Sequence, residues 1–166
     1  MVYLRKILVT TDLSDFSLAA IEYAASFGLL YSSKLYLLHV ADTTPSAFTL
    51  QGLDSRGKHC QQGVDPRHTQ QLEEFALKKL NADMKLTLVV RNGVPADEIQ
   101  RFAEEEGIDL IVMATHGRTG LKHIVLGSVA EKVVRLSTVP VLTVKPHPLR
   151  ENILQNEDIE SELHLH

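Results

Sequence analysis

Two segments of the sequence combine small or flexible residues with hydrogen-bonding side chains, and each follows a short apolar run. The first is Thr10-Thr11-Asp12-Leu13-Ser14, and the second is the run from Ala114 to Gly120. Gly127-Ser128 comes next, at the start of an amphipathic stretch. Free backbone N–H groups and the positive end of a dipole at a helix start favour an anion. The loop from Ala114 to Ser128 is therefore predicted to hold phosphate groups.

The residues around Ser128 also allow a second interpretation. Ser128-Val-Ala-Glu131 fits a capping box, with Ser at the N-cap and Glu three residues later. In the first interpretation, Gly117 and Gly127 let the backbone approach an anion closely, and Ser128 Oγ donates to a phosphate oxygen. Spacing alone leaves phosphate binding and helix capping both open.

Alternating strands and helices must position these segments. The sequence contains five strand-like runs. Each of the first four is followed along the chain by a segment whose apolar residues have helical spacing. This alternation predicts an α/β domain with an open, doubly wound parallel sheet and helices on both faces. If the two polar segments share one pocket, strands one and four are neighbours and the order is 3-2-1-4-5. The predicted strands are 6–10, 34–40, 85–90, 109–114 and 139–144, and the predicted helices are 15–30, 68–80, 95–106 and 128–136.

The connecting segments differ in character. Residues 41–67 are rich in Gly, Pro, Ser, Thr and Gln without periodicity, and a loop of that length is expected to be a lid or disordered. Asn92-Gly93 predicts a turn, and Pro95 suits a first helical position. We expect one domain over residues 1–147, followed by an acidic tail, 148–166, that is a loose helix or disordered.

Composition narrows the class of protein. The chain has 166 residues, of which 44% are hydrophobic and 23% charged, as in ordinary globular proteins. No apolar run reaches the roughly 20 residues of a membrane helix, and no signal sequence opens the chain. A net charge of −4 argues against nucleic acid as a partner. With Cys60 as the single cysteine, the composition predicts a cytoplasmic protein without a membrane or nucleic-acid partner.

Several rival sites fail on chemistry. A phosphoacceptor domain with this strand count would need a carboxylate at Ala114, and a methyl group cannot be phosphorylated. The segment 52–58 matches P-loop spacing, but His59 stands where Ser or Thr is required. The eight histidines are scattered, so we expect no metal site, and His39 is interpreted as a hydrogen-bonded core residue. No nucleophile elbow is present, so a binding module is preferred to an enzyme.

The string MATHGRTGLKHIVLGSVAEKV, residues 113–133, resembles the ATP-binding signature of the universal stress protein family. In that signature Gly-x-x-Gly is followed nine residues later by Gly-Ser or Gly-Thr. Gly117, nine residues and then Gly127-Ser128 reproduce its second half, whereas the first family glycine falls on Ala114. KILVTTDLSDFSLAAIEYA, KLYLLHV and STVPVLTVKP also look like this family, so the resemblance covers residues 5–146.

The resemblance implies a stress-response regulator or sensor that binds ATP with Mg²⁺ or Mn²⁺. We add the hypothesis that occupancy orders residues 41–67 as a lid. It also implies a homodimer made through the strand from Val139 to Val144, an apolar edge. AMP sensing, slow hydrolysis or autophosphorylation, and a scaffold dimer without nucleotide stay open as alternatives. The nucleotide-binding residues that the resemblance implies are Thr10, Thr11, Asp12, Val40, Met113, Ala114, His116, Gly117, Arg118, Gly127, Ser128 and Val129.

Overall fold

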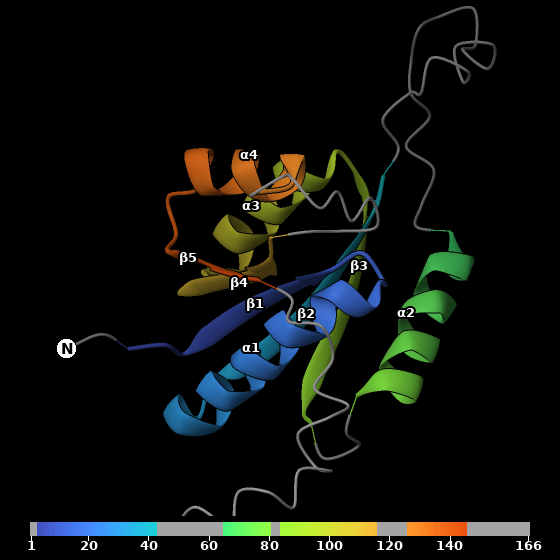
Figure 1. Ribbon diagram of the computed structural model, residues 1–166, viewed down its shortest axis with the longest axis horizontal. Coiled ribbons are helices and arrows are strands. Elements are labelled where there is room, and N and C mark those ends of the chain that lie inside the picture. Colours follow the sequence, from blue (N-terminus) through green and yellow to red (C-terminus); the bar gives the residue numbers. More distant parts are fainter. Residues whose placement is uncertain (1–2, 43–64, 81–83, 116–125, 146–166) are drawn as a thin grey trace, which may run out of the picture.

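A computed structural model describes residues 3–42, 65–80, 84–115 and 126–145, and these residues form alternating strands and helices (Figure 1). The alternation follows the order expected from the sequence. In chain order the elements are β1 (Lys6–Thr11), the 3-10 helix η1 (Asp15–Ser17), α1 (Leu18–Tyr31), β2 (Lys34–Asp42), α2 (Pro66–Lys79), β3 (Leu86–Gly93), α3 (Pro95–Glu106), β4 (Leu110–Ala114), α4 (Ser128–Leu136) and β5 (Val141–Val144).

The strands form one parallel sheet in the order β3-β2-β1-β4-β5, which confirms the predicted fold class and strand order. β1 pairs with β2 on one side and with β4 on the other, where Leu8 lies opposite Ile111. The strand order reverses between β1 and β4. The carboxyl ends of these two strands therefore meet where open α/β sheets bind their ligands.

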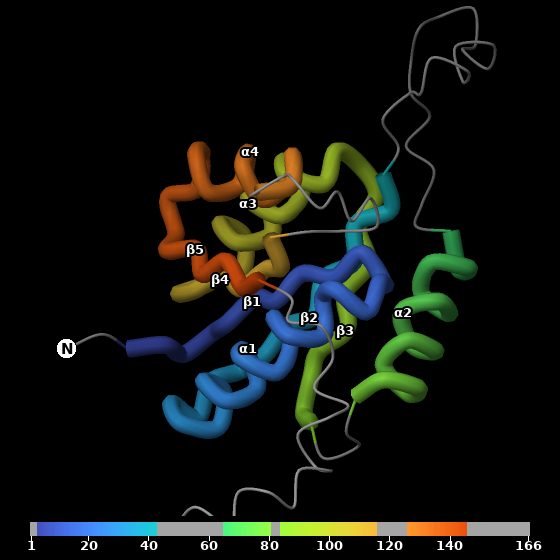
Figure 2. The backbone as a smooth tube through the Cα atoms, in the orientation of Figure 1, coloured from blue at the N-terminus to red at the C-terminus, as the bar shows by residue number. Residues whose placement is uncertain are grey.

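Each face of the sheet carries its own hydrophobic core. Because successive strand residues point to opposite faces, Ile7 and Val9 pack beneath α1 and α2, whereas Leu8 packs beneath α3 and α4. Figure 1 shows α3 and α4 on one side of the sheet and α1 and α2 on the other. This arrangement orients the start of every helix toward the carboxyl edge of the sheet, as the chain trace shows (Figure 2).

The boundaries of β2 and β3 differ from those predicted. β2 continues through Asp42 and α2 begins at Pro66, so both ends of the segment predicted as a long loop belong to regular elements. The turn predicted at Asn92-Gly93 is wrong, because these residues pair with Ala41 and Asp42 as the last rungs of β3 and β2. Residues 43–64 of the predicted loop lie outside the described residues.

Helix α3 matches its predicted bounds at both ends. Pro95 is its first residue, where a missing N–H costs no intrahelical bond. Gly107 ends it in the left-handed conformation, with φ of 62°. Glu98 on this helix is buried, and its carboxylate pairs with the guanidinium groups of Arg101 and Arg91. Like the other helices of the described ranges, α3 is too short or too polar to cross a bilayer.

Candidate functional site

The turn after β1 is held by hydrogen bonds within the protein. Thr11 is buried, and its hydroxyl lies 2.7 Å from Ser17 Oγ and accepts from the backbone N–H of Leu13 at 2.9 Å. The Thr11 carbonyl oxygen lies 3.0 Å from Nδ1 of His39, which is buried, as expected for a core histidine. The Thr11 side chain therefore shapes the turn from inside.

Asp12 presents a carboxylate at the carboxyl edge. Its Oδ1 accepts from Ser14 N at 3.1 Å and from Ser14 Oγ at 2.6 Å, which closes a short turn. The intervening Leu13 has a φ of 66°, a conformation that this turn imposes on a residue with a side chain. Asp12 is half-buried and directly follows β1, the strand that pairs with β4.

A backbone junction connects β4, β5 and α4. Thr115, immediately after β4, donates its N–H to the Val144 carbonyl at 2.9 Å and accepts the N–H of Gly127 at 2.7 Å. A Cβ added to Gly127 would lie 3.2 Å from this Thr115 oxygen, so the close approach favours glycine. Thr115 lies in the loop predicted to hold phosphate but was not among the individually predicted binding residues; its position directly after a buried strand was the available signal.

The capping-box interpretation of Ser128 is wrong. Gly127 is the N-cap of α4, with φ of −68° and ψ of 154°, and Ser128 is the first helical residue. The first intrahelical bond runs from Glu131 N to Gly127 O at 2.8 Å. A glycine N-cap has no side chain to accept from the first turn, and Ser128 is exposed. Within the described residues, the first turn of α4 thus keeps its N–H groups available.

The structure gathers most of the predicted site residues at this edge. Thr10 and Thr11 end β1 and Asp12 follows it, and Met113 and Ala114 end the neighbouring strand β4. Met113 is buried in the core under α3 and α4. The predicted residues Val40 (in β2), Gly127, Ser128 and Val129 (at the start of α4) are also described, whereas His116, Gly117 and Arg118 lie outside the described residues.

The start of α2 lies at the same edge and is built differently. The Asp65 carboxylate accepts the backbone N–H of Arg67 at 2.9 Å and its guanidinium at 2.6 Å. The guanidinium hydrogen bond, followed by the backbone bond, lowers the pKa of Asp65 to about 2. The ring of His68 lies 6.1 Å from that of His39, and its buried Nδ1 has no partner among the described groups.

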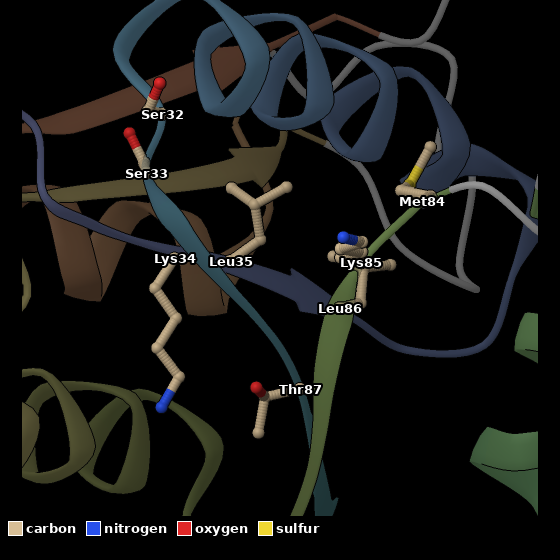
Figure 3. A pocket seen from close by; sticks show the side chains of 8 residues that line it. All are labelled: Ser32, Ser33, Lys34, Leu35, Met84, Lys85, Leu86 and Thr87. Carbon is tan, nitrogen blue, oxygen red and sulfur yellow. The ribbon is translucent and has the colours of Figure 1, made fainter.

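A pocket of about 600 Å³ lies at the opposite edge of the sheet (Figure 3). It is an open groove at the amino ends of β2 and β3, where Leu35 points inward between Ser33 and Leu86. None of the predicted nucleotide-binding residues lines it. Residues 65–80, 84–115 and the other described ranges contain no cluster of three or more His, Cys, Asp or Glu side chains that would hold a metal ion.

These features define a class of protein: a doubly wound α/β domain with an open helix start at its topological switch point. The sequence profile of the "Universal stress protein family" matches residues 4–145. The chain belongs to this family.

Named relatives agree over most of their lengths. Universal stress protein MJ0531 of Methanocaldococcus jannaschii is 38% identical over 146 residues, which is 85% of this chain and 82% of the relative. Universal stress protein MJ0577 of the same organism is 33% identical, over 85% of this chain and 94% of the relative. Universal stress protein YxiE of Bacillus subtilis is 34% identical, over 85% of this chain and 99% of the relative.

Solved structures share the fold. The structure of MJ0577, described as a structure-based assignment of biochemical function, superposes with a TM-score of 0.66 at 31% identity and covers 88% of this chain and 99% of its own. A universal stress protein in complex with cAMP superposes with a TM-score of 0.60 at 23% identity and covers 87% of this chain and 99% of its own.

Proposed function

We propose that this protein binds an adenine nucleotide, ATP with Mg²⁺ or Mn²⁺, and acts as a nucleotide-dependent regulator or sensor in the stress response. The observation that carries the proposal is the start of α4. Gly127 leaves this helix without a side-chain cap, at the edge where the carboxyl ends of β1 and β4 meet. An open helix start at a switch point is suited to a phosphate group.

The phosphates would be held by the first turn of α4. Its N–H groups point toward the carboxyl edge, and Ser128 carries an exposed hydroxyl that can donate to a phosphate oxygen. The 2.7 Å bond from Gly127 to Thr115 fixes the start of this turn against β4. In the proposal, His116, Gly117 and Arg118 complete the phosphate site, and Val129 contributes its backbone N–H.

The adenosine would lie toward β1 and β2. Asp12 holds a fixed carboxylate there, a group suited to accept from a ribose hydroxyl or an amino group. Thr10, Met113 and Ala114 border the same edge, and Val40 would offer its backbone to adenine. Occupancy would order the remainder of residues 41–67 as a lid over the base.

The cation would arrive with the nucleotide. Mg²⁺ prefers oxygen ligands and is commonly bound through substrate phosphates rather than by a cage of side chains. In the proposal, the phosphates of the nucleotide supply most of the cation's ligands. The cation would neutralise charge on the phosphates, and Ser128 and the α4 amides would orient them. We propose binding without efficient turnover.

The comparisons support adenine nucleotides as the ligand class. One structural neighbour was solved with cAMP, which shares adenine, ribose and phosphate with ATP. That complex makes AMP-type ligands the second candidate, in which the protein senses a monophosphate.

A homodimer through the β5 edge accompanies the proposal. β5 is an outer strand of the sheet, and Val141, Leu142 and Thr143 are only half-buried. Pairing with a second copy would cover this edge. We further propose a cytoplasmic location, consistent with the single Cys60.

The proposal is tested by denaturing the purified protein and identifying any released small molecule. The nucleotide-free protein is then titrated calorimetrically with ATP, AMP, cAMP and GTP, each with and without Mg²⁺. We expect ATP with Mg²⁺ to bind most tightly and GTP weakly. Tighter binding of AMP or cAMP than of ATP would favour the monophosphate alternative. No released nucleotide together with no binding at millimolar concentrations would contradict the proposal.

A further inference from the structure

Helix α1 is apolar nearly all round, which is unusual for a helix on a protein surface. Its sequence, LAAIEYAASFGLLY, contains one charged residue, Glu22. Only one face packs against the sheet, through Ala20, Ile21, Ala24 and Gly28. A helix without a polar face is normally buried on more than one side. The outer part of α1 is thus suited to cover by another segment.

Three apolar side chains of α1 form a continuous stripe, in which the half-buried Phe27 lies between the exposed Tyr23 and Leu30. Tyr23, Phe27 and Leu30 are spaced four and three residues apart, so they lie on one side of the helix. Tyr23 is 50% exposed and Leu30 is 72% exposed. We call Tyr23, Phe27 and Leu30 the α1 stripe.

The α1 stripe faces β4 and β5 rather than β2. Gly28 marks the β2 side, because a Cβ added there would lie 2.8 Å from the Leu35 side chain. Successive helix residues turn by about 100°, so Phe27 lies on the other side of the buried face and Leu29 lies beyond Gly28. Leu29, which is 86% exposed, is therefore on the opposite flank from the α1 stripe.

The sheet beside the α1 stripe is also incompletely covered. Leu110 of β4 and Leu142 of β5 point to this face and are only partly buried, whereas Val144 is buried beside α1. α1 lies along β1 on this face, and within the described ranges no helix follows β5 (Figure 2). Strands are about 4.8 Å apart and a helix is about 10 Å wide, so two outer strands leave room for one further segment.

We propose that residues 146–166 of this chain occupy that surface, along the α1 stripe and over β4 and β5. The described chain leaves β5 at Lys145, next to Val144 and on the same face as α1. The 21 residues that follow lie beyond the 4–145 match to the family and contain six Leu or Ile residues among five acidic ones. Even if these 21 residues were fully helical, they would be longer than α1, whose 14 residues span roughly 21 Å.

Covalent attachment favours this segment over other occupants. A segment tethered at Lys145 has an effective concentration in the millimolar range at a surface that begins beside its attachment point. A second copy of the chain must reach the same surface from solution. The docked segment would bury the aliphatic side chains of residues 146–166 and leave its acidic side chains in solvent. The α1 stripe and α4 lie on opposite faces of the sheet, so this proposal does not rest on nucleotide binding at the start of α4.

Carbene footprinting of the full chain without nucleotide compares Leu30 with Leu29. These neighbours have similar exposure in the described structure but lie on opposite flanks of α1. We expect Leu30 and Tyr23 to be labelled several-fold less than Leu29. In a full-length variant with all six Leu and Ile residues of 146–166 changed to Ser, Leu30 should be labelled as strongly as Leu29.

A second measurement keeps the chain intact and changes one leucine. Leu30→Ser should speed cleavage by a glutamate-specific protease within residues 157–162 by about tenfold, the effect of losing one buried leucine contact, and Leu29→Ser should leave the rate unchanged. Equal labelling of Leu29 and Leu30 in the full chain would overturn the proposal. Protection of Leu30 that appears only at high protein concentration would also overturn it, because a second copy would then be the occupant.

Discussion

Helices α2 and α4 begin at the same edge of the sheet, but among the described residues only the start of α2 has a side-chain cap. Asp65 accepts the backbone N–H of Arg67 and forms an ion pair with its guanidinium. α4 begins with Gly127, which has no side chain to offer, and its first residue, Ser128, is exposed. Where a side chain of the protein accepts a hydrogen bond from a first-turn N–H group, that group is not available to a ligand.

The junction behind α4 is nevertheless rigidly built. The N–H of Gly127 donates to Thr115, and Thr115 donates to Val144, so three elements fix this helix start. Fixed N–H groups without an acceptor among the described residues are suited to receive an anion. The difference between the two starts thus separates a structural helix terminus from a proposed binding terminus.

The largest expected effect comes from placing a negative charge at the open start. Ser128→Asp should weaken ATP binding about 100-fold, or about 2.7 kcal/mol, through repulsion of the phosphates. A negative side chain at a helix start interacts favourably with the positive end of the helix dipole. The Tm of the variant should therefore equal that of the unchanged protein or be slightly higher. Calorimetric titration and a melting curve measure the two effects.

Val134→Asp is the matched control for this change. It adds the same charge to an exposed position further along α4 and should leave ATP affinity nearly unchanged. Equal loss of affinity in the two variants would show that net charge, rather than the start of α4, determines binding.

Thr11→Val should lower stability by about 2 kcal/mol. The change leaves the buried Ser17 hydroxyl and the Leu13 N–H without the oxygen that they now share. Because the Thr11 hydroxyl is engaged inside the turn, nucleotide affinity should change less than threefold, about 0.6 kcal/mol. Denaturant unfolding and titration check both values; a large loss of affinity at normal stability would assign the hydroxyl to the ligand.

Two glycine substitutions distinguish close approach from backbone strain. Gly127→Ala brings a Cβ to 3.2 Å from the Thr115 oxygen at an ordinary φ of −68°, so we expect about tenfold weaker ATP binding, about 1.4 kcal/mol. Gly107→Ala meets no neighbouring atom but has a φ of 62°, so about 1 kcal/mol of stability should be lost without loss of binding. Loss of ATP binding in Gly107→Ala together with loss of stability alone in Gly127→Ala would contradict these roles.

The smallest effect concerns the self-satisfied start of α2. The pKa of Asp65 is lowered from 3.8 to about 2, so its ionised form stabilises the folded state above pH 4 and this contribution disappears as pH falls through 2. Asp65→Asn should speed amide hydrogen exchange at the start of α2 at neutral pH, and the two proteins should converge near pH 2. ATP binding should be unaffected.

Periodicity predicted the architecture well because both faces of the sheet are buried. Continuous apolar strands such as β4 and the Pro95 start of α3 follow directly from residue types. The extension of β3 through Asn92 and Gly93 could not be predicted locally, because it depends on pairing with the last two residues of β2. Turn propensity was overridden by a ladder whose partner is some fifty residues away in sequence.

The site shows the same limit. Ser128 and Glu131 satisfy the capping-box pattern in sequence, but the bond between Gly127 and Thr115 places Gly127 at the N-cap. The internal role of the Thr11 hydroxyl likewise depends on Ser17, which only the fold of η1 brings into reach. Residue types predicted which strand ends meet at the switch point, whereas tertiary hydrogen bonds determine which groups at this edge remain available.

The most direct measurement is an amide NMR titration of the full chain with ATP and Mg²⁺. Phosphate binding at the start of α4 predicts the largest chemical-shift changes at Gly127, Ser128 and Val129, with smaller changes at Asp12 and Val40, and no change at the start of α2. Shift changes centred on Arg67 and His68 at the start of α2, or none anywhere at millimolar ATP, would contradict it.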